Sequence, residues 1–161
     1  MKKFELTSDF KMYLGMKLFR IKALVDFGNV KAGDLGGYIE KEKNLSHNGN
    51  AWVSGNAQVY DNAWVYGDAR VSGNARVYDN ARVSGNADIL QITGLGTEHR
   101  PTTVFRAEDG IKVACGCFLG DLGQFRERVK NTRTGKVQEE YLKFAELVEI
   151  YFGKERVKEE E

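Results

Sequence analysis

The sequence contains few cysteines and histidines and has almost no net charge, and each of these features argues against a class of protein. The 161 residues include 24 Lys and Arg against 23 Asp and Glu, so the formal net charge is +1. A chain this close to neutral is not expected to bind nucleic acid or a membrane surface. The two cysteines, Cys115 and Cys117, are too close together to staple a fold, which favours a reducing compartment.

Long apolar runs are also missing. The start of the chain, MKKFELTSDFKMYLGMKLFR, interrupts any apolar stretch with polar residues, so it fits neither a signal peptide nor a membrane span. With 42% hydrophobic and 29% charged residues, the composition is that of one globular unit. We therefore expect a soluble, cytoplasmic protein.

What the sequence has in abundance is repetition, with a period of six residues. From residue 49 it reads GNAWVS, GNAQVY, DNAWVY, GDARVS, GNARVY, DNARVS and GNADIL. This period fits neither a helix nor a long strand, but it fits a β-solenoid in which three hexads form one triangular coil. Gly, Asn and Asp before each Ala suit tight corners. The residues expected to point inward are Val53, Val59, Val65, Val71, Val77 and Val83, with Ala51, Ala57, Ala63, Ala69, Ala75 and Ala81.

Three hexads per coil predict that residues 18 apart stack on each other. Residues 54–71 and 72–89 are nearly the same sequence in this register. Aromatic pairs and Arg–Trp pairs on adjacent strands are favourable neighbours. The predicted stacked pairs are Tyr60 with Tyr78, Asp61 with Asp79, Trp64 with Arg82, and Trp52 with Arg70.

These hexads resemble the left-handed parallel β-helix of hexapeptide-repeat acyltransferases. A closer resemblance, carried by residues 18–46, the repeats and residues 102–130, is to small hexapeptide-repeat proteins of bacteria and their phages. The resemblance implies a mainly β fold built on a short left-handed β-helix with 18 residues per coil. It also implies a homotrimer, because the related family packs its solenoids around a threefold axis.

The solenoid is expected over residues 37–96, which corresponds to about 3.3 coils and roughly 16 Å of height. In this count Ile39 and Leu45 fall at Ala positions. Such a short stack needs caps at both ends. We expect an N-terminal β cap at 1–36 and a small C-terminal α+β element at 97–161.

Local patterns give the elements of the two caps. A strand is predicted from Phe19 to Phe27, where apolar and mostly polar residues alternate. Asp121 and Gln124 resemble a capping box at the start of a helix that ends near 130. The end of the chain, KERVKEEE, is expected to be frayed and solvated. The remaining predicted elements are strands at 89–93, 102–106 and 111–117, a hairpin turn at 108–110, and a helix at 137–152.

An enzyme of this fold needs residues that the sequence hardly supplies. Acyl transfer requires a general base, most often His, and the repeats contain no histidine and no inserted loop. His47 is in phase with the inward valines, which favours a cap histidine packed against the core. His99 is a lone loop residue. An acyltransferase that uses acetyl-coenzyme A stays the alternative function.

Metal and nucleic-acid sites are disfavoured by spacing. A zinc site like that of the β-helix carbonic anhydrases needs three histidines, and Cys115 and Cys117 have no second pair to complete a tetrahedral site. We expect no cofactor and no metal. Arg70, Arg76 and Arg82 are six residues apart, so they lie on three different faces and form no stripe along a phosphate backbone.

The function favoured by the sequence is non-enzymatic binding or assembly, with a host protein or a small anionic ligand as partner. Tyr, Trp and Arg dominate protein interfaces, and the residues predicted to form a trimer contact are Trp52, Tyr60, Trp64 and Tyr78. A solenoid face that merely stabilises itself by stacking is the open alternative. The residues predicted to bind an anion are His99, Arg100, Arg70 and Arg82, with Arg100 as a bidentate donor.

Overall fold

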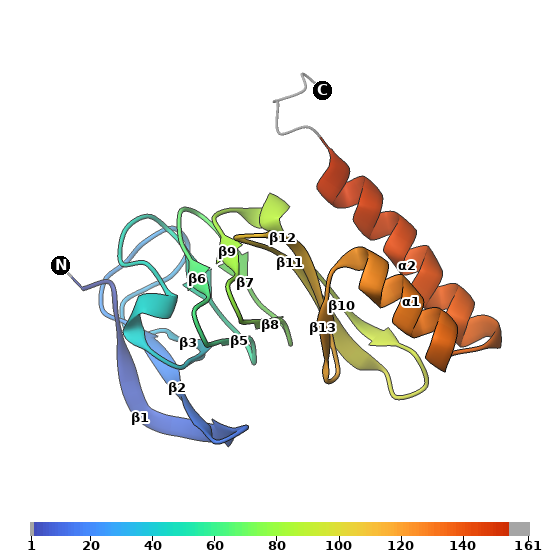
Figure 1. Ribbon diagram of the computed structural model, residues 1–161. Helices are drawn as coiled ribbons and strands as arrows, with labels where there is room; N and C mark the ends of the chain where they lie inside the picture. Colours follow the sequence, from blue (N-terminus) through green and yellow to red (C-terminus); the bar gives the residue numbers. More distant parts are fainter. Residues whose placement is uncertain (1, 155–161) are drawn as a thin grey trace.

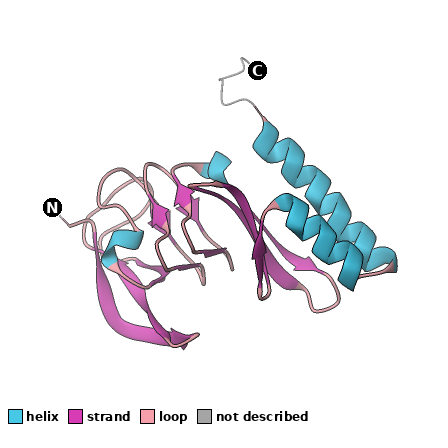
Figure 2. Cartoon of the chain, in the orientation of Figure 1, coloured by secondary structure: helices cyan, strands magenta, loops and turns pink. Residues whose placement is uncertain are grey.

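The computed structural model describes residues 2–154, and in this range the protein is an arch of three parts (Figure 1). An N-terminal hairpin leads into the short coils of the repeat, and a sheet carrying two helices follows. The long helices belong only to the third part (Figure 2). Of the end expected to be frayed, residues 155–161 lie outside the described residues.

The N-terminal hairpin continues directly into the repeat. β1 (Phe4–Tyr13) and β2 (Met16–Ala23) pair in antiparallel fashion, and β2 pairs with β3 (Leu35–Ile39). β3 then pairs in parallel with a strand of the repeat. The hairpin and one face of the repeat therefore form a single five-stranded sheet, in the order β1-β2-β3-β5-β8.

The repeat is a β-solenoid with the register that the sequence predicts. Trp52 pairs with Arg70, Gln58 with Arg76, and Trp64 with Arg82, each pair in parallel and 18 residues apart. The three ladders, β4–β7, β5–β8 and β6–β9, form three faces. The strands are β4 (Trp52–Val53), β5 (Gln58–Val59), β6 (Trp64–Val65), β7 (Arg70–Val71), β8 (Arg76–Val77) and β9 (Arg82–Val83).

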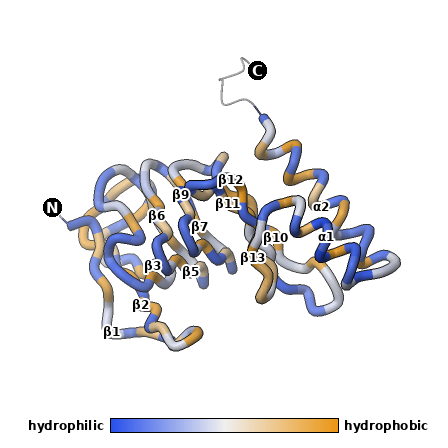
Figure 3. The backbone as a smooth tube through the Cα atoms, in the orientation of Figure 1, coloured by the Kyte–Doolittle hydropathy of each residue, from blue (hydrophilic) through white to orange (hydrophobic). Residues whose placement is uncertain are grey.

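The predicted inward columns are confirmed. The six valines are at most 1% exposed and the six alanines at most 2%, and apolar and polar residues alternate closely along these coils (Figure 3). The corners use the first residue of each of the first six hexads, which has a positive φ: +56° at Asp61, +59° at Asp79, and +59° to +71° at the glycines of positions 49, 55, 67 and 73. Such backbone angles are rare for most residues, which explains the choice of Gly and Asp.

The first coil departs from the predicted phase. Ile39 lies opposite Val59, and Leu45 opposite Val65, each 20 residues apart rather than 18. Ile39 and Leu45 therefore extend the valine columns, and their predicted placement at Ala positions is wrong. The cause is two extra residues in the segment between Leu45 and Val53, which the six-residue count did not allow for.

The C-terminal end of the solenoid also differs from the prediction, which placed it at residue 96. The parallel ladders end at Val83, and a 3₁₀ turn (Asn86–Asp88) follows. Residues 89–95 form β10 (Ile89–Leu95), the first strand of an antiparallel sheet. The solenoid is therefore shorter than the sequence predicts.

Both ends of the solenoid are capped by the flanking segments. Phe4 and Ile21 of the hairpin, and Phe105 and Ala114 of the C-terminal sheet, are at most 1% exposed and belong to the same core as the valines. Val104 and Val113, which precede Phe105 and Ala114 along their strands and face the opposite side of the sheet, are part of a second core under the helices. Side chains alternate across a strand, so one sheet covers the solenoid and also supports the helices.

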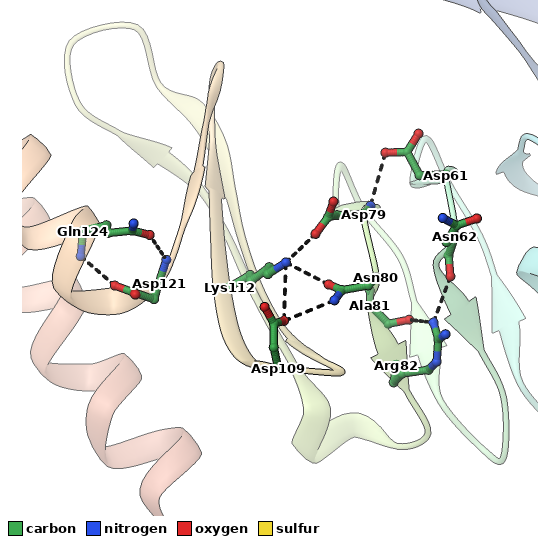
Figure 4. Close-up of polar contacts among 10 residues, drawn as sticks. All are labelled: Asp61, Asn62, Asp79, Asn80, Ala81, Arg82, Asp109, Lys112, Asp121 and Gln124. Atoms are coloured by element: carbon green, nitrogen blue, oxygen red, sulfur yellow. Dashed lines mark hydrogen bonds and ion pairs between the residues drawn. The ribbon is translucent and has the colours of Figure 1, made fainter.

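The C-terminal part is a four-stranded antiparallel sheet, in the order β10-β11-β12-β13, followed by two helices. The predicted capping box is confirmed, because Asp121 accepts the backbone N–H of Gln124 at 2.8 Å and Gln124 accepts that of Asp121 at 2.9 Å (Figure 4). β1 and β13 were not predicted. Within the described range neither helix is long and apolar enough to cross a membrane. The bounds are β11 (Arg100–Ala107), β12 (Gly110–Cys115), β13 (Phe118–Gly120), α1 (Leu122–Thr132) and α2 (Gly135–Gly153).

Lys112 of β12 connects the C-terminal sheet to a corner of the solenoid (Figure 4). Its Nζ forms an ion pair with Asp79 and donates to Asn80 Oδ1 at 2.8 Å. One coil below, Asp61 accepts the backbone N–H of Asp79 at 3.2 Å, and Glu40 in turn accepts that of Asp61 at 2.8 Å. At this corner each carboxylate thus accepts a backbone N–H from the next coil toward the C-terminus. The carboxylate of the last coil, that of Asp79, is neutralised by Lys112.

Burial of a charge in the valine column is expected to abolish folding. Val65 is fully buried, and a Val65→Asp variant leaves an unpaired carboxylate there, at a cost larger than most single domains tolerate. We expect no cooperative transition in circular dichroism or urea unfolding. Ser72→Asp, at an exposed position of the same repeat, is the matched control and should unfold like the wild type. A cooperatively folded Val65→Asp protein would contradict the assigned core.

Lys3 is a buried amine beneath the first coil. The residue is 4% exposed, and its Nζ donates to the carbonyl oxygens of Ala51 at 2.6 Å and Gly49 at 3.3 Å. Burial, reinforced by nearby Arg70, lowers the pKa of Lys3 from 10.5 to about 8. Between these two values the unfolded chain binds more protons than the folded chain.

Stability is therefore expected to rise with pH in this window. From pH 8 to pH 9 the free energy of unfolding of the wild type should increase by about 1 kcal/mol relative to that of Lys3→Met. Below pH 8 the amine is charged in both states, and the difference between the two proteins should level off. Urea unfolding at several pH values measures this, and parallel curves for the two proteins would contradict it.

Candidate functional site

Two of the residues predicted to form a trimer contact are buried by the chain itself. Trp52 is 4% exposed and Tyr60 only 2%. Phe27 packs edge-on against Trp52, with ring centroids 5.3 Å apart, and the hairpin covers Tyr60 in a similar way. The predicted contact is wrong for these two, because the repeat period shows which residues leave the solenoid but not what covers them. Tyr78 is half-buried, and Trp64 is 40% exposed.

The four residues predicted to bind an anion do not come together. Arg82 forms an ion pair with Glu108 on the β6–β9 face, whereas Arg70 lies on the β4–β7 face. His99 is exposed, and its Nδ1 lies 3.0 Å from the carbonyl oxygen of Gly94. Only Arg100 lines the large cleft described below.

His47 is the packed cap histidine that the sequence predicts. Its ring stacks on Phe4, with centroids 4.2 Å apart and an interplanar angle of 10°. Nδ1 accepts the backbone N–H of Lys3 at 3.0 Å, and Nε2 lies 2.8 Å from a carboxylate oxygen of Glu42. Because both ring nitrogens are engaged, neither is available as a general base.

The candidate site is a cleft of about 770 Å³ over the β5–β8 face. Its floor comes from the repeat, one wall from the tip of the β1–β2 hairpin, and the other from the start of β11 and the β12–β13 turn. The hairpin and the C-terminal sheet project to the same side of the solenoid (Figure 1). The caps that close the core therefore also build the walls of the cleft.

Arg76 links the two walls across the floor. Nη1 donates to the hydroxyl of Tyr13 at 2.6 Å, and Nη2 donates to the carbonyl oxygen of Gly116 at 2.7 Å. The guanidinium carbon also lies 5.8 Å from the ring centroid of Tyr78. No ion pair within residues 2–154 includes Arg76. This half-buried cation thus has neutral partners only.

Aromatic rings surround this guanidinium. Tyr60 and Tyr78 are stacked, with centroids 4.9 Å apart and an interplanar angle of 7°, and Tyr13 meets Tyr60 edge-on at 5.6 Å. Burial raises the pKa of both Tyr60 and Tyr78. The tyrosines therefore stay neutral at physiological pH and provide flat apolar surface rather than charge.

The charged groups of the cleft are mostly positive. Lys11, Arg76 and Arg100 line it, of which Arg100 forms an ion pair with Glu98, and Asp61 is the one carboxylate among its described lining residues. Burial, together with Arg20, lowers the pKa of Lys11. One oxygen of Asp61 already accepts the backbone N–H of the corner above it. The cleft therefore favours an anion.

Gln58 adds an unused acceptor beside Arg76. The two residues are neighbours on adjacent strands, and Gln58 Oε1 is buried without a hydrogen-bond partner among the described residues. An unpaired buried acceptor is costly.

No group of three or more His, Cys, Asp or Glu that could hold a metal ion occurs within residues 2–154.

A known family of repeats matches the part of the chain that forms the floor of this cleft. The YdcK β-solenoid repeat matches residues 57–73, 63–77 and 75–87. The middle of the chain is a β-solenoid repeat. The matched segments contain Tyr60, Arg76 and Tyr78 but neither wall. No curated protein matches the sequence.

Sequence reasoning missed the contribution of the walls. Tyr13 comes from a strand that was not predicted, and Arg76 was assigned only to a ring of arginines. The tip sequence Tyr13-Leu14-Gly15-Met16 contains a turn signal in its glycine. That signal could have located a hairpin, although not its position over the β5–β8 face.

The contact between Tyr13 and Arg76 is expected to hold the hairpin tip in place. Tyr13→Phe removes one hydrogen bond to a charged donor at a half-buried site, and we expect about 1 kcal/mol of destabilisation in urea unfolding. Tyr66→Phe is the matched control, because no hydrogen bond of the Tyr66 hydroxyl is found within residues 2–154. Equal effects of the two substitutions would contradict the proposed role of Tyr13.

Proposed function

We propose that the protein is a non-enzymatic binding protein whose cleft holds an organic anion with a flat apolar part. The single observation that carries this proposal is the half-buried guanidinium of Arg76, which has no carboxylate partner among the described residues and is surrounded by tyrosine rings. The proposal is narrower than the sequence expectation of any host protein or small anion. It places the ligand on one face.

Arg76 has donors to spare for such a ligand. A guanidinium has five N–H donors, and two of them are used by Tyr13 and Gly116. The remaining donors suit a carboxylate or phosphate, which guanidinium groups bind in a bidentate manner. A partly desolvated cation without a counter-charge gains more from such an anion than an exposed one does.

The size and lining of the cleft fit a small molecule. Its volume of about 770 Å³ is within the usual range of small-molecule sites. The ring of Tyr78 and the side chains of Tyr13 and Leu119 provide apolar surface, against which a flat ring can pack. Lys11 adds positive charge that attracts an anion to the cleft, whereas the charge of Arg100 is already paired with Glu98.

Binding is favoured over acyl transfer by the positions of the two histidines. Neither His47 nor His99 lines the cleft, so no histidine is placed there to act as a general base. A trimer through Trp52 and Tyr60 forms no part of the proposal, because both are buried. We further propose that the solenoid is a left-handed, hexapeptide-type β-helix, supported by its six-residue period and 18-residue register.

The anion can be tested with charged and uncharged forms of the same ring. We expect 4-hydroxybenzoate or AMP to bind in isothermal titration calorimetry, and 4-hydroxybenzamide or adenosine to bind at least tenfold more weakly. Arg76→Gln should weaken binding of the charged probe by about tenfold or more, because a hydrogen bond to a charged group contributes roughly 1.5–3 kcal/mol. Small molecules that co-purify with the protein, identified by mass spectrometry, extend the panel.

Arg82→Gln is the matched control, since Arg82 occupies the same position in its hexad but lies outside the cleft. It should leave the affinity for the charged probe unchanged. Two outcomes would overturn the proposal. One is equal binding to the wild type and Arg76→Gln, and the other is no binding of either charged probe together with no organic anion among the co-purified molecules.

A further inference from the structure

A second groove lies on another face of the solenoid and contains the one exposed tryptophan. This cavity, of about 800 Å³, follows the β6–β9 face and is lined by Trp64 and Arg82. The 3₁₀ turn at Glu42–Asn44 lies at one end and Glu108 at the other. It shares no lining residue with the cleft over the β5–β8 face, so it is a separate candidate site.

Trp64 is held in a fixed orientation although it is exposed. Its ring stacks on Tyr66, with centroids 3.9 Å apart and an interplanar angle of 18°. The residue remains 40% exposed, whereas Trp52, at the same position of its hexad, is 4% exposed. A large apolar ring that stays partly exposed, and that a stacked neighbour keeps rigid, is well suited to stack against a ligand at low entropic cost.

Most charges around this ring are already compensated. Arg82 is paired with Glu108, and Glu42 lies 2.8 Å from His47 and 3.2 Å from Lys2. This distinguishes the groove from the cleft, where Arg76 has no carboxylate partner among the described residues. The groove therefore gives little reason for a ligand of strong net charge.

The paired groups keep hydrogen-bonding capacity for a neutral ligand. Asn62 lines the groove with an exposed side-chain amide, which has both donors and an acceptor. Arg82 donates to the backbone carbonyl oxygen of Asn62 at 2.8 Å, so its guanidinium reaches the solenoid corner that carries Asn62 (Figure 4). Ser46 adds a hydroxyl from the coil below.

We propose that this groove binds one pyranose unit of a saccharide. The C–H groups on one face of a pyranose ring pack flat on an indole ring, and its hydroxyl groups point outward toward planar amide, carboxylate and guanidinium groups. Trp64 supplies the stacking surface, and Asn62, Arg82 and Glu108 line the same groove and carry groups that can hydrogen-bond to the hydroxyl groups of a stacked ring. This site is independent of the anion cleft.

Binding to an array of immobilised oligosaccharides, followed by tryptophan fluorescence with maltotriose, cellotriose and N,N′,N″-triacetylchitotriose, tests the proposal. We expect at least one saccharide to change the tryptophan emission. The change can be assigned to Trp64, because the other tryptophan, Trp52, is buried on another face. Trp64→Ala should weaken that binding at least tenfold, and Trp64→Phe should restore part of it. Asn62→Ala, at an exposed position, should weaken it as well, and Arg76→Gln should leave it unchanged.

Three outcomes would overturn the proposal. The first is that no saccharide binds the array or changes the fluorescence. The second is that binding survives in both Trp64→Ala and Asn62→Ala, with folding of each variant checked by thermal unfolding. The third is that adenosine, and no saccharide, quenches Trp64, which would assign the groove to a nucleobase. None of these results affects the anion cleft, whose test uses Arg76→Gln.

Discussion

The stacking of the inward valine and alanine columns is the constraint on which the rest of the structure depends. Each strand of the solenoid is only two residues long, so no coil has enough ladder hydrogen bonds or buried area to be stable alone. A short stack also exposes its first and last valines. Phe4 and Ile21 close one end and Phe105 and Ala114 the other. The flanks are therefore part of the core, not appendages to it.

The same requirement creates the cleft. Both caps extend beyond the solenoid on the same side (Figure 1). On the β5–β8 side the projecting edges are the hairpin tip with Tyr13 and the β12–β13 turn with Gly116. Arg76 hydrogen-bonds to both. The site thus arises where two caps and one repeat residue meet.

The sequence predicted the periodic part of this molecule well and the contacts between its parts poorly. Val65 and the stacked pair of Tyr60 and Tyr78 could be placed because a period fixes both direction and register. Leu45 was misplaced because two extra residues shift the phase without any mark in the pattern. Trp52 was assigned to the surface because its cover, Phe27, comes from the N-terminal cap, whose position over the repeat the period does not give. Long-range packing of irregular segments leaves no local signal.

Two arginines show how the surroundings of equivalent residues can differ within a repeat. Arg76 and Arg82 occupy the same position in GNARVY and DNARVS, and both extend outward from buried valines. Glu108 of the C-terminal sheet neutralises Arg82, whereas within residues 2–154 the guanidinium of Arg76 hydrogen-bonds to the hydroxyl of Tyr13 and a backbone carbonyl and has no carboxylate partner. The repeat therefore supplies equivalent side chains on each face. Which of them remains a cation without a carboxylate partner is decided by the residues that the caps place beside it, and the proposed anion site depends on that choice.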